Sequence, residues 1–215
     1  MKEYITQTIS YVKSELQGAE SGHDWFHIER VYNNTLLLLN SEKANEEVCI
    51  LGALLHDIAD SKFHGGDETV GPKKAYEFMS SIGIDEEVKK HVVLIIENIS
   101  FKGGNFQKIF HSKELEIVQD ADRLDAIGAI GIARTFNYGG YKNNSMHDPE
   151  QLPKLNLTKE EYKNHKGTTI NHFYEKLLLL KDLMNTETGK QIAQKRHEYM
   201  EGFLEQFFKE WKGER

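Results

Sequence analysis

Residues 49–60 read CILGALLHDIAD, an apolar run that carries the adjacent pair His56 and Asp57 near its end. The run belongs to a helix that we expect over about residues 45–59. An unpaired charged side chain beside such an apolar stretch would be costly to bury. A bound cation would remove that cost, so this stretch predicts both a core helix and a metal site at its end.

Apolar residues recur with the period of an α-helix along most of the chain. The pattern predicts helices over residues 2–17, 23–40, 45–59, 70–82, 85–98, 113–136, 160–184 and 187–211. Asp85 is expected to cap the helix that begins beside it. The glycine pairs at 65–66 and 103–104 indicate loops. Gly128 and Gly131 lower the helix propensity of the sixth segment but would let another backbone approach closely.

We expect residues 137–157 to form an irregular loop, because they contain glycines, asparagines and two prolines. A loop of this length in a compact domain is usually functional or disordered. The chain shows no alternating strand pattern and no internal repeat. We therefore predict an all-α fold with a single domain over residues 1–215, its motif-bearing core at about 20–140 and its C-terminal helices at about 160–211.

The composition fits a globular protein of 215 residues, with 39% hydrophobic and 28% charged residues. The net charge of −7 argues against a nucleic-acid partner, which normally needs a basic stripe. Cys49 is the single cysteine and is expected to be a buried, unreactive thiol. Residues 1–16 lack the apolar core of a signal peptide, and no apolar run is long enough to span a membrane, so we expect a cytoplasmic protein.

Two further side chains extend the pair at 56–57 to a set of four. His27 lies upstream in HDWFHIERV, and Asp122 lies downstream in VQDADRLDAIG. His27 and His56 are 29 positions apart, which is consistent with two antiparallel helices joined by a turn. Two imidazoles and two carboxylates suit Mn, Fe, Mg or Zn and leave coordination positions open for water or a phosphate oxygen.

The sequence resembles the HD-domain superfamily of metal-dependent phosphohydrolases, with His27, His56, Asp57 and Asp122 at the matching positions. A closer similarity, to the small bacterial HD proteins of the YpgQ type, rests on the segments GHDWFHIERV (22–31), ALLHDIADSKFHGGDE (53–68), ISFKGG (99–104) and VQDADRLDAIGAIGIARTF (118–136). The resemblance implies an all-α helical bundle, one divalent metal and hydrolysis of phosphate ester or anhydride bonds. For the closer group it implies pyrophosphohydrolase action on nucleoside triphosphates. We expect manganese first, with Mg, Fe, Co or Zn as alternatives.

Asp60 lies three positions after Asp57, on nearly the same helical face. Several HD phosphohydrolases have an acidic residue at the matching position that assists the attacking water, commonly a glutamate. We expect Asp60 to act as general base or to orient water, although a surface carboxylate is the alternative. Lys62, His64 and Arg134 are candidates for binding substrate phosphate, and solvated loop positions are the alternative.

Other residues near the motifs have open roles at this point. His23 shares a helix face with His27 and is either an outer partner of the site or a helix-start residue. Asp125 either orients a ligating histidine or faces solvent. His91 and His111 lie where two-metal HD enzymes carry extra histidines, but His91 is expected to be an exposed helix position.

The leading functional hypothesis is a nucleotide pyrophosphohydrolase that releases pyrophosphate and a nucleoside monophosphate. Nucleotide monophosphatase, cyclic-nucleotide phosphodiesterase and a non-catalytic nucleotide-binding sensor are the alternatives. The expected partner is a phosphorylated small molecule, with no membrane partner. A homodimer through the aromatic C-terminal helix is an additional hypothesis, and a stripe facing the core would explain the same residues.

Overall fold

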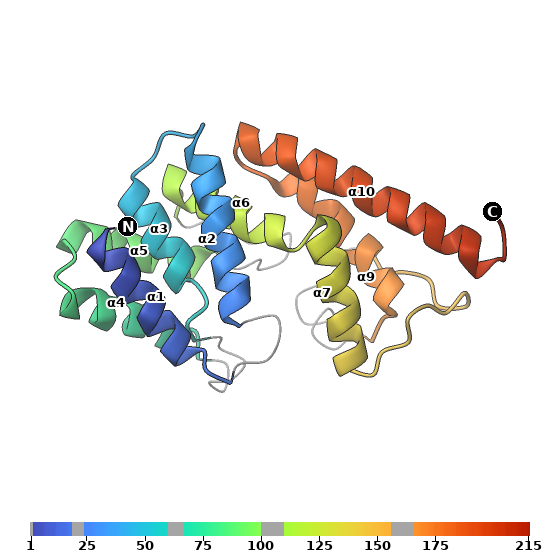
Figure 1. Ribbon diagram of the computed structural model, residues 1–215, viewed down its shortest axis with the longest axis horizontal. Coiled ribbons are helices and arrows are strands. Elements are labelled where there is room, and N and C mark those ends of the chain that lie inside the picture. The colour runs from blue at the N-terminus through green and yellow to red at the C-terminus, as the bar shows by residue number, and fades with distance from the viewer. Residues whose placement is uncertain (1, 19–23, 60–66, 100–109, 156–165) are drawn as a thin grey trace. The chain divides into compact units, whose positions relative to one another are not determined.

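The computed structural model describes residues 2–18, 24–59, 67–99, 110–155 and 166–215 (Figure 1). Within these ranges the regular elements are all helical, which confirms the predicted all-α fold. The chain forms two compact units, Met1–Asp122 and Arg123–Arg215. The assignment of a single domain remains a prediction. None of the helices in the described ranges has the length and apolar character that a membrane crossing requires.

The first unit is built around one apolar helix. Its elements are α1 (Glu3–Glu15), α2 (Trp25–Leu39), α3 (Glu46–Leu55), α4 (Val70–Ser81), α5 (Glu86–Asn98) and residues 113–122 of α6 (Lys113–Asp125). Helix α3 packs against α1, α2 and α5, and α4 packs against α5. Each residue of α3 from Val48 to Leu55 is buried, as its apolar sequence requires. The predicted buried thiol is confirmed, because Cys49 lies within this helix and burial raises its pKa to about 12.

Side-chain caps fix where these helices begin. The Oδ1 atom of Asn45 accepts hydrogen bonds from the backbone of Glu47 and Val48 at 3.0 and 3.3 Å, at the start of α3. Asp85 accepts one from Glu87 at 2.9 Å, which confirms the predicted cap of α5. Such caps satisfy amide groups that the first helical turn leaves without an intrahelical partner.

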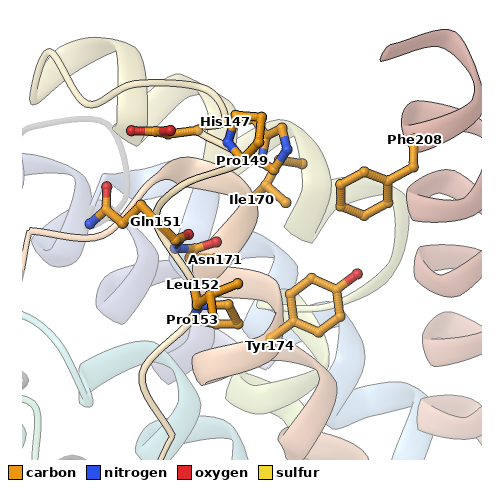
Figure 2. A pocket seen from close by; sticks show the side chains of 10 residues that line it. His147, Pro149, Gln151, Leu152, Pro153, Ile170, Asn171, Tyr174 and Phe208 are labelled. Atoms are coloured by element: carbon orange, nitrogen blue, oxygen red, sulfur yellow. Dashed lines mark hydrogen bonds between the residues drawn. The ribbon is translucent and has the colours of Figure 1, made fainter. Parts of the chain in front are cut away.

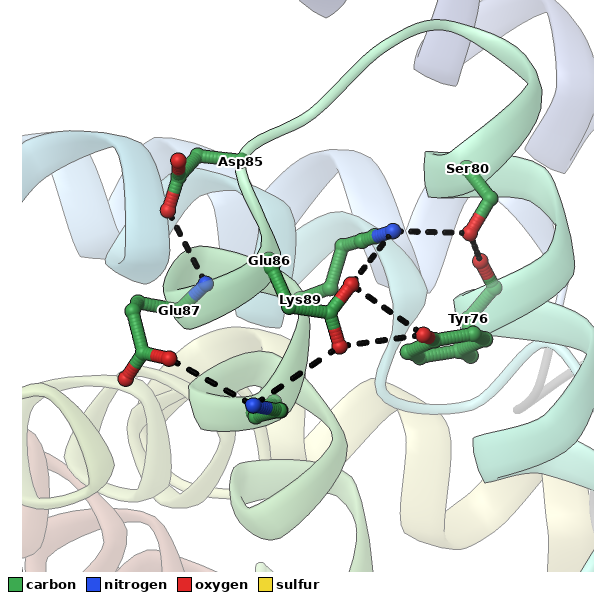
Figure 3. A network of polar contacts seen from close by, with 7 residues as sticks. Tyr76, Ser80, Asp85, Glu86, Glu87 and Lys89 are labelled. Atoms are coloured by element: carbon green, nitrogen blue, oxygen red, sulfur yellow. Dashed lines mark hydrogen bonds and ion pairs between the residues drawn. The ribbon is translucent and has the colours of Figure 1, made fainter.

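Helices α4 and α5 form a hairpin that is held by a polar network (Figure 3). The ammonium group of Lys89 lies 2.9 Å from a Glu86 carboxylate oxygen and donates to Ser80 at 3.0 Å. It also lies 4.7 Å from the centre of the Tyr76 ring, whose hydroxyl donates to Glu86 at 3.0 Å. A buried ammonium group is thereby paired from three sides.

The second unit contains α7 (Gly128–Tyr141), α9 (Thr169–Glu175), the 3-10 helix η2 (Leu177–Leu183) and α10 (Glu187–Trp211). Helix α7 packs against α9 and α10. Phe136, Phe173 and Phe203 meet in the interior of this unit, with ring centres 5.9–6.2 Å apart. The second unit therefore has an aromatic core of its own.

Two predicted helices are wrong in extent. The segment predicted at 113–136 is divided into α6 and α7, because Gly128 adopts a left-handed conformation with φ +75° that helix interiors do not use. The described part of the segment predicted at 160–184 contains α9 and then η2, so it is not one α-helix.

The irregular loop predicted from residue 137 begins later than expected. Helix α7 continues through Gly139 and Gly140 to Tyr141. A Cβ atom on Gly139 would lie 2.3 Å from the Thr169 hydroxyl oxygen, so the absent side chain makes room for α9. Tertiary packing here outweighs the low helix propensity of glycine.

Gly131 lies close to the backbone of the turn that leads into α7, and this contact can be tested by substitution. A Cβ atom on Gly131 would lie 2.3 Å from the Ala126 carbonyl oxygen, which is backbone and cannot rotate away. We expect Gly131→Ala to lower the free energy of unfolding by about 2 kcal/mol, as overpacking does. Gly140→Ala on the same helix is the control, since a Cβ atom there meets nothing within 4 Å, and it should be neutral or stabilising. Equal urea midpoints for the two variants would refute the steric argument.

A second prediction concerns pH. Burial, with a smaller contribution from Lys176, lowers the pKa of the partly exposed His172 from 6.5 to about 4. Between these two values the unfolded chain binds a proton that the folded chain does not, so stability falls as the pH drops from about 6.5 to 4. We expect His172→Gln to remove about 2 kcal/mol of this acid destabilisation. Urea unfolding of both proteins at pH 7.5 and 4.5 checks it, and unchanged pH sensitivity in the variant would show that another group is responsible.

Candidate metal centre

Three side chains that can ligate a metal meet where α2 faces the end of α3. His27, His56 and Asp57 each offer a ligand atom, and these atoms all lie within 4.8 Å of one another. His27 lies in the first turn of α2, and the pair at 56–57 directly follows α3. The two helices pack side by side, as the 29-residue spacing predicted.

Asp122, on α6, approaches the same histidine. Its Oδ1 atom lies 3.5 Å from Nε2 of His27. Two ligand atoms that are each about 2.1 Å from one ion, at angles between 90° and 109°, lie about 3.0 to 3.4 Å apart. The observed separation is therefore close to that of two ligands of one cation.

The burial of these groups leaves one side of the centre accessible. The His27 side chain is 4% exposed, whereas that of Asp122 is 37% exposed. His56 and Asp57 are half-buried, while Leu54 and Leu55 before them are fully buried. The apolar run thus ends at the edge of the core, where its last residues can face both a buried partner and solvent.

The hydrogen bonding of His56 selects the nitrogen that can ligate. Nδ1 of His56 lies 2.9 Å from the carbonyl oxygen of Ala53, one helical turn earlier. A carbonyl oxygen only accepts, so Nδ1 carries the proton and Nε2 keeps its lone pair. A ligating imidazole is usually oriented by a hydrogen bond of this kind, made by the ring nitrogen that does not bind the metal. The His27 and His56 rings meet edge to face, with centres 5.4 Å apart.

The start of α2 positions His27. Asp24 is the N-cap of this helix, and its Oδ1 atom accepts from the backbone N–H of His27 at 3.0 Å. The same short motif thus supplies a ligand candidate and the cap that fixes it. These residues fit a divalent cation with nitrogen and oxygen ligands, which is the donor set predicted for Mn, Fe, Mg or Zn.

The other predicted site residues lie outside the described ranges or in the second unit. Asp60, Lys62 and His64 lie outside the described residues, as does His23. Arg134 belongs to α7 in the second unit, where its guanidinium forms an ion pair with the buried Asp125. It also donates to the Asp125 carbonyl at 3.2 Å. A substrate role for Arg134 stays a prediction.

The pairing of Asp125 answers one question that the sequence left open. Its side chain is buried and does not face solvent, and it forms an ion pair with Arg134. Arg196 of α10 donates to the carbonyl oxygen of Leu124, so two guanidinium groups bind the last turn of α6. Cations are favourable at a helix C-terminus. Arg196 had no recognisable signal in the sequence, since it lies among other polar residues of α10.

His91 and His111 are both engaged elsewhere. The expectation that His91 is exposed is wrong: its side chain is 27% exposed, and Nε2 lies 2.9 Å from the Ser112 hydroxyl. His111 is exposed, with Nε2 2.8 Å from a Glu116 carboxylate oxygen. Among the residues that the structure describes, neither joins the group of potential ligands.

A cavity of about 350 Å³ lies in the second unit (Figure 2). Its lining includes Pro149, Leu152 and Pro153, together with Ile170 and Tyr174 of α9, and Phe208 projects toward it from α10. None of the four predicted metal ligands contributes to its described lining.

Comparisons with known proteins find relatives by family, by sequence and by fold. The HD domain family matches residues 25–127, a span that includes all four predicted ligands. YpgQ from Bacillus subtilis is 36% identical over 210 residues, which cover 96% of this chain and 93% of YpgQ. A solved HD-superfamily hydrolase from Bacillus thuringiensis is 45% identical, with a TM-score of 0.79 and 98% of each chain covered.

The crystal structure of Bacillus subtilis YpgQ in complex with ADP is also similar, with a TM-score of 0.74 and 34% identity over 96% of this chain and 97% of that chain. Sequence and fold therefore point to the same relatives over nearly the whole length. The chain belongs to the HD-domain family, among relatives that include HD-superfamily hydrolases.

Proposed function

We propose that this protein is a divalent-metal-dependent phosphohydrolase that acts on nucleotides, most specifically a pyrophosphohydrolase of (deoxy)nucleoside triphosphates. One observation carries the proposal: ligand atoms of His27, His56 and Asp57 lie within 4.8 Å of one another, and Asp122 lies 3.5 Å from His27. Membership in a family with known hydrolases supports the reaction class.

His27, His56, Asp57 and Asp122 would hold one ion, manganese first, with Mg, Fe, Co or Zn as alternatives. When bound, such an ion supplies Lewis acidity at a phosphoryl oxygen and lowers the pKa of a coordinated water. The two carboxylates offset its double positive charge. The site would then carry little net charge, and an approaching polyphosphate would meet no repulsion from the ligands themselves.

The side chains have distinct tasks in this proposal. The hydrogen bond from Nδ1 of His56 to Ala53 keeps the ring orientation and its unprotonated Nε2 fixed through the reaction. Asp60 is proposed to accept the proton of the attacking water or to orient that water. Lys62, His64 and Arg134 are proposed to bind phosphate oxygens, whose charge rises in the transition state.

In the proposed reaction, water attacks the α-phosphorus and the bond from that phosphorus to the α–β bridging oxygen breaks. The products are a nucleoside monophosphate and pyrophosphate, with a proton released. The complex of YpgQ with ADP supports a nucleotide as the ligand class. A cytoplasmic location and a homodimer belong to the same proposal.

Removing one carboxylate ligand should weaken metal binding while the protein still folds. We expect Asp57→Ala to weaken Mn²⁺ binding by at least 100-fold and to reduce turnover by about 10³-fold, because one ligand and one compensating charge are lost. His56→Ala should behave in the same way. Calorimetric titration with Mn²⁺ and phosphorus-31 NMR of the products measure both effects.

Asp182→Ala is the matched control, since this carboxylate is exposed on η2 of the second unit. It should leave metal affinity and turnover unchanged. Full activity of Asp57→Ala would reject the proposed function.

The identity of the products distinguishes the alternatives. Purified protein would be incubated with a panel of nucleotides and with Mn²⁺, Mg²⁺, Co²⁺ or Zn²⁺. Pyrophosphate is the expected product; inorganic phosphate would instead indicate a monophosphatase, and a ring-opened monophosphate a cyclic-nucleotide phosphodiesterase. Thermal stabilisation by nucleotides with no product under any metal would favour a binding sensor.

A further inference from the structure

Asn34 is a buried polar residue on the helix that carries His27, and the reaction gives it no role. It lies seven positions after His27, so both side chains project from nearly the same face of α2, two turns apart. Both residues are buried, at 3% exposure for His27 and 9% for Asn34. This spacing was readable in the sequence, but nothing there indicated the partner of Asn34.

The side-chain amide of Asn34 donates to the carbonyl oxygen of Ala121 at 3.0 Å, across 87 positions of sequence. Ala121 immediately precedes Asp122. A backbone carbonyl has two lone pairs, so it can accept this bond in addition to one within α6. The contact is buried, where a hydrogen bond between neutral groups is most costly to lose.

The two contacts from α2 reach α6 at adjacent residues. His27 lies 3.5 Å from the Asp122 carboxylate, and Asn34 binds the Ala121 carbonyl. In a helix the carbonyl groups point toward the C-terminus, whereas side chains tilt toward the N-terminus. The two contacts therefore join two successive residues of α6 to positions two turns apart on α2.

We propose that Asn34 is a positioning residue for the metal centre, and that it sets the distance of the Asp122 carboxylate from His27 through the Ala121 carbonyl. The inference rests on the proposed function, since it assumes that Asp122 is a ligand. Metal ligands depend strongly on their outer partners, whose loss typically costs 10- to 100-fold in affinity. Asn34 acts through the backbone, so we expect the lower end of this range.

The test compares Asn34→Leu with Asn171→Leu. Asn171 is a matched control because it is also buried and its amide donates to the Gln151 carbonyl at 2.8 Å, but in the second unit. Both variants should lose thermal stability without metal, because each removes a hydrogen bond from a buried side chain to a backbone carbonyl. Only Asn34→Leu should weaken Mn²⁺ binding, by about tenfold, as measured from the electron paramagnetic resonance signal of free Mn²⁺. Should Asn34→Leu fail to fold, Asn34→Ala leaves room for a water to bind the carbonyl and is measured instead.

A double-mutant cycle then tests whether the effect passes through Asp122. Zn²⁺ is the probe, because it binds such ligands more tightly than Mn²⁺ and remains measurable with one ligand removed. Asn34→Leu should weaken Zn²⁺ binding about tenfold in the wild-type background and less than twofold in the Asp122→Ala background. A merely structural role would give the same loss in both.

The outcomes separate this inference from the proposed function. Absence of Mn²⁺ and Zn²⁺ binding by the wild-type protein would overturn both. Normal binding by the wild type, with an Asn34→Leu affinity within twofold of it, would overturn the positioning role alone. Equal weakening in Asn171→Leu, or equal losses in both backgrounds of the cycle, would also overturn it.

Discussion

Ligand atoms of His27, His56 and Asp57 lie within 4.8 Å of one another at the edge of an apolar core, and the Asp122 carboxylate lies 3.5 Å from the nearly buried His27 imidazole. Charged groups brought out of water need a compensating partner. Here the donor types, the distances within 4.8 Å and the orientation of His56 all favour a divalent cation as that partner. The surrounding contacts hold α2, the end of α3 and α6 at the positions that such a cation would require.

Each segment is fixed by ordinary backbone hydrogen bonding close to the proposed ligand. Asp24 caps α2 on the amide of His27 itself. Ala53 binds the ring of His56 within the same turn of α3. Asn34 binds the carbonyl that precedes Asp122. The bonds to the carbonyl groups of Ala53 and Ala121 add no charge near the ligand candidates, whereas the cap of α2 is the carboxylate of Asp24.

Glycine shows how packing and propensity compete in the second unit. Gly128 ends one helix and starts the next through its left-handed conformation, as a breaker should. Gly139 lies within α7 because α9 occupies the space where a side chain would be. Glycine therefore interrupts the predicted helix at Gly128 but lies inside a helix at Gly139. The position of Gly139 depends on Thr169, a neighbour that is distant in the chain.

The sequence alone determined the helical class, most helix positions and the four candidate ligands, because helical periodicity and the motifs around His27, His56 and Asp122 are local patterns. It also predicted the buried thiol and the cap at Asp85. Only the tertiary structure decided that Asp125 pairs with Arg134, that Arg196 binds the end of α6, and that Asn34 reaches Ala121. Those contacts join residues that are 9 to 87 positions apart, and a polar side chain in a helix carries no local sign of which distant carbonyl or carboxylate will satisfy it when it is buried.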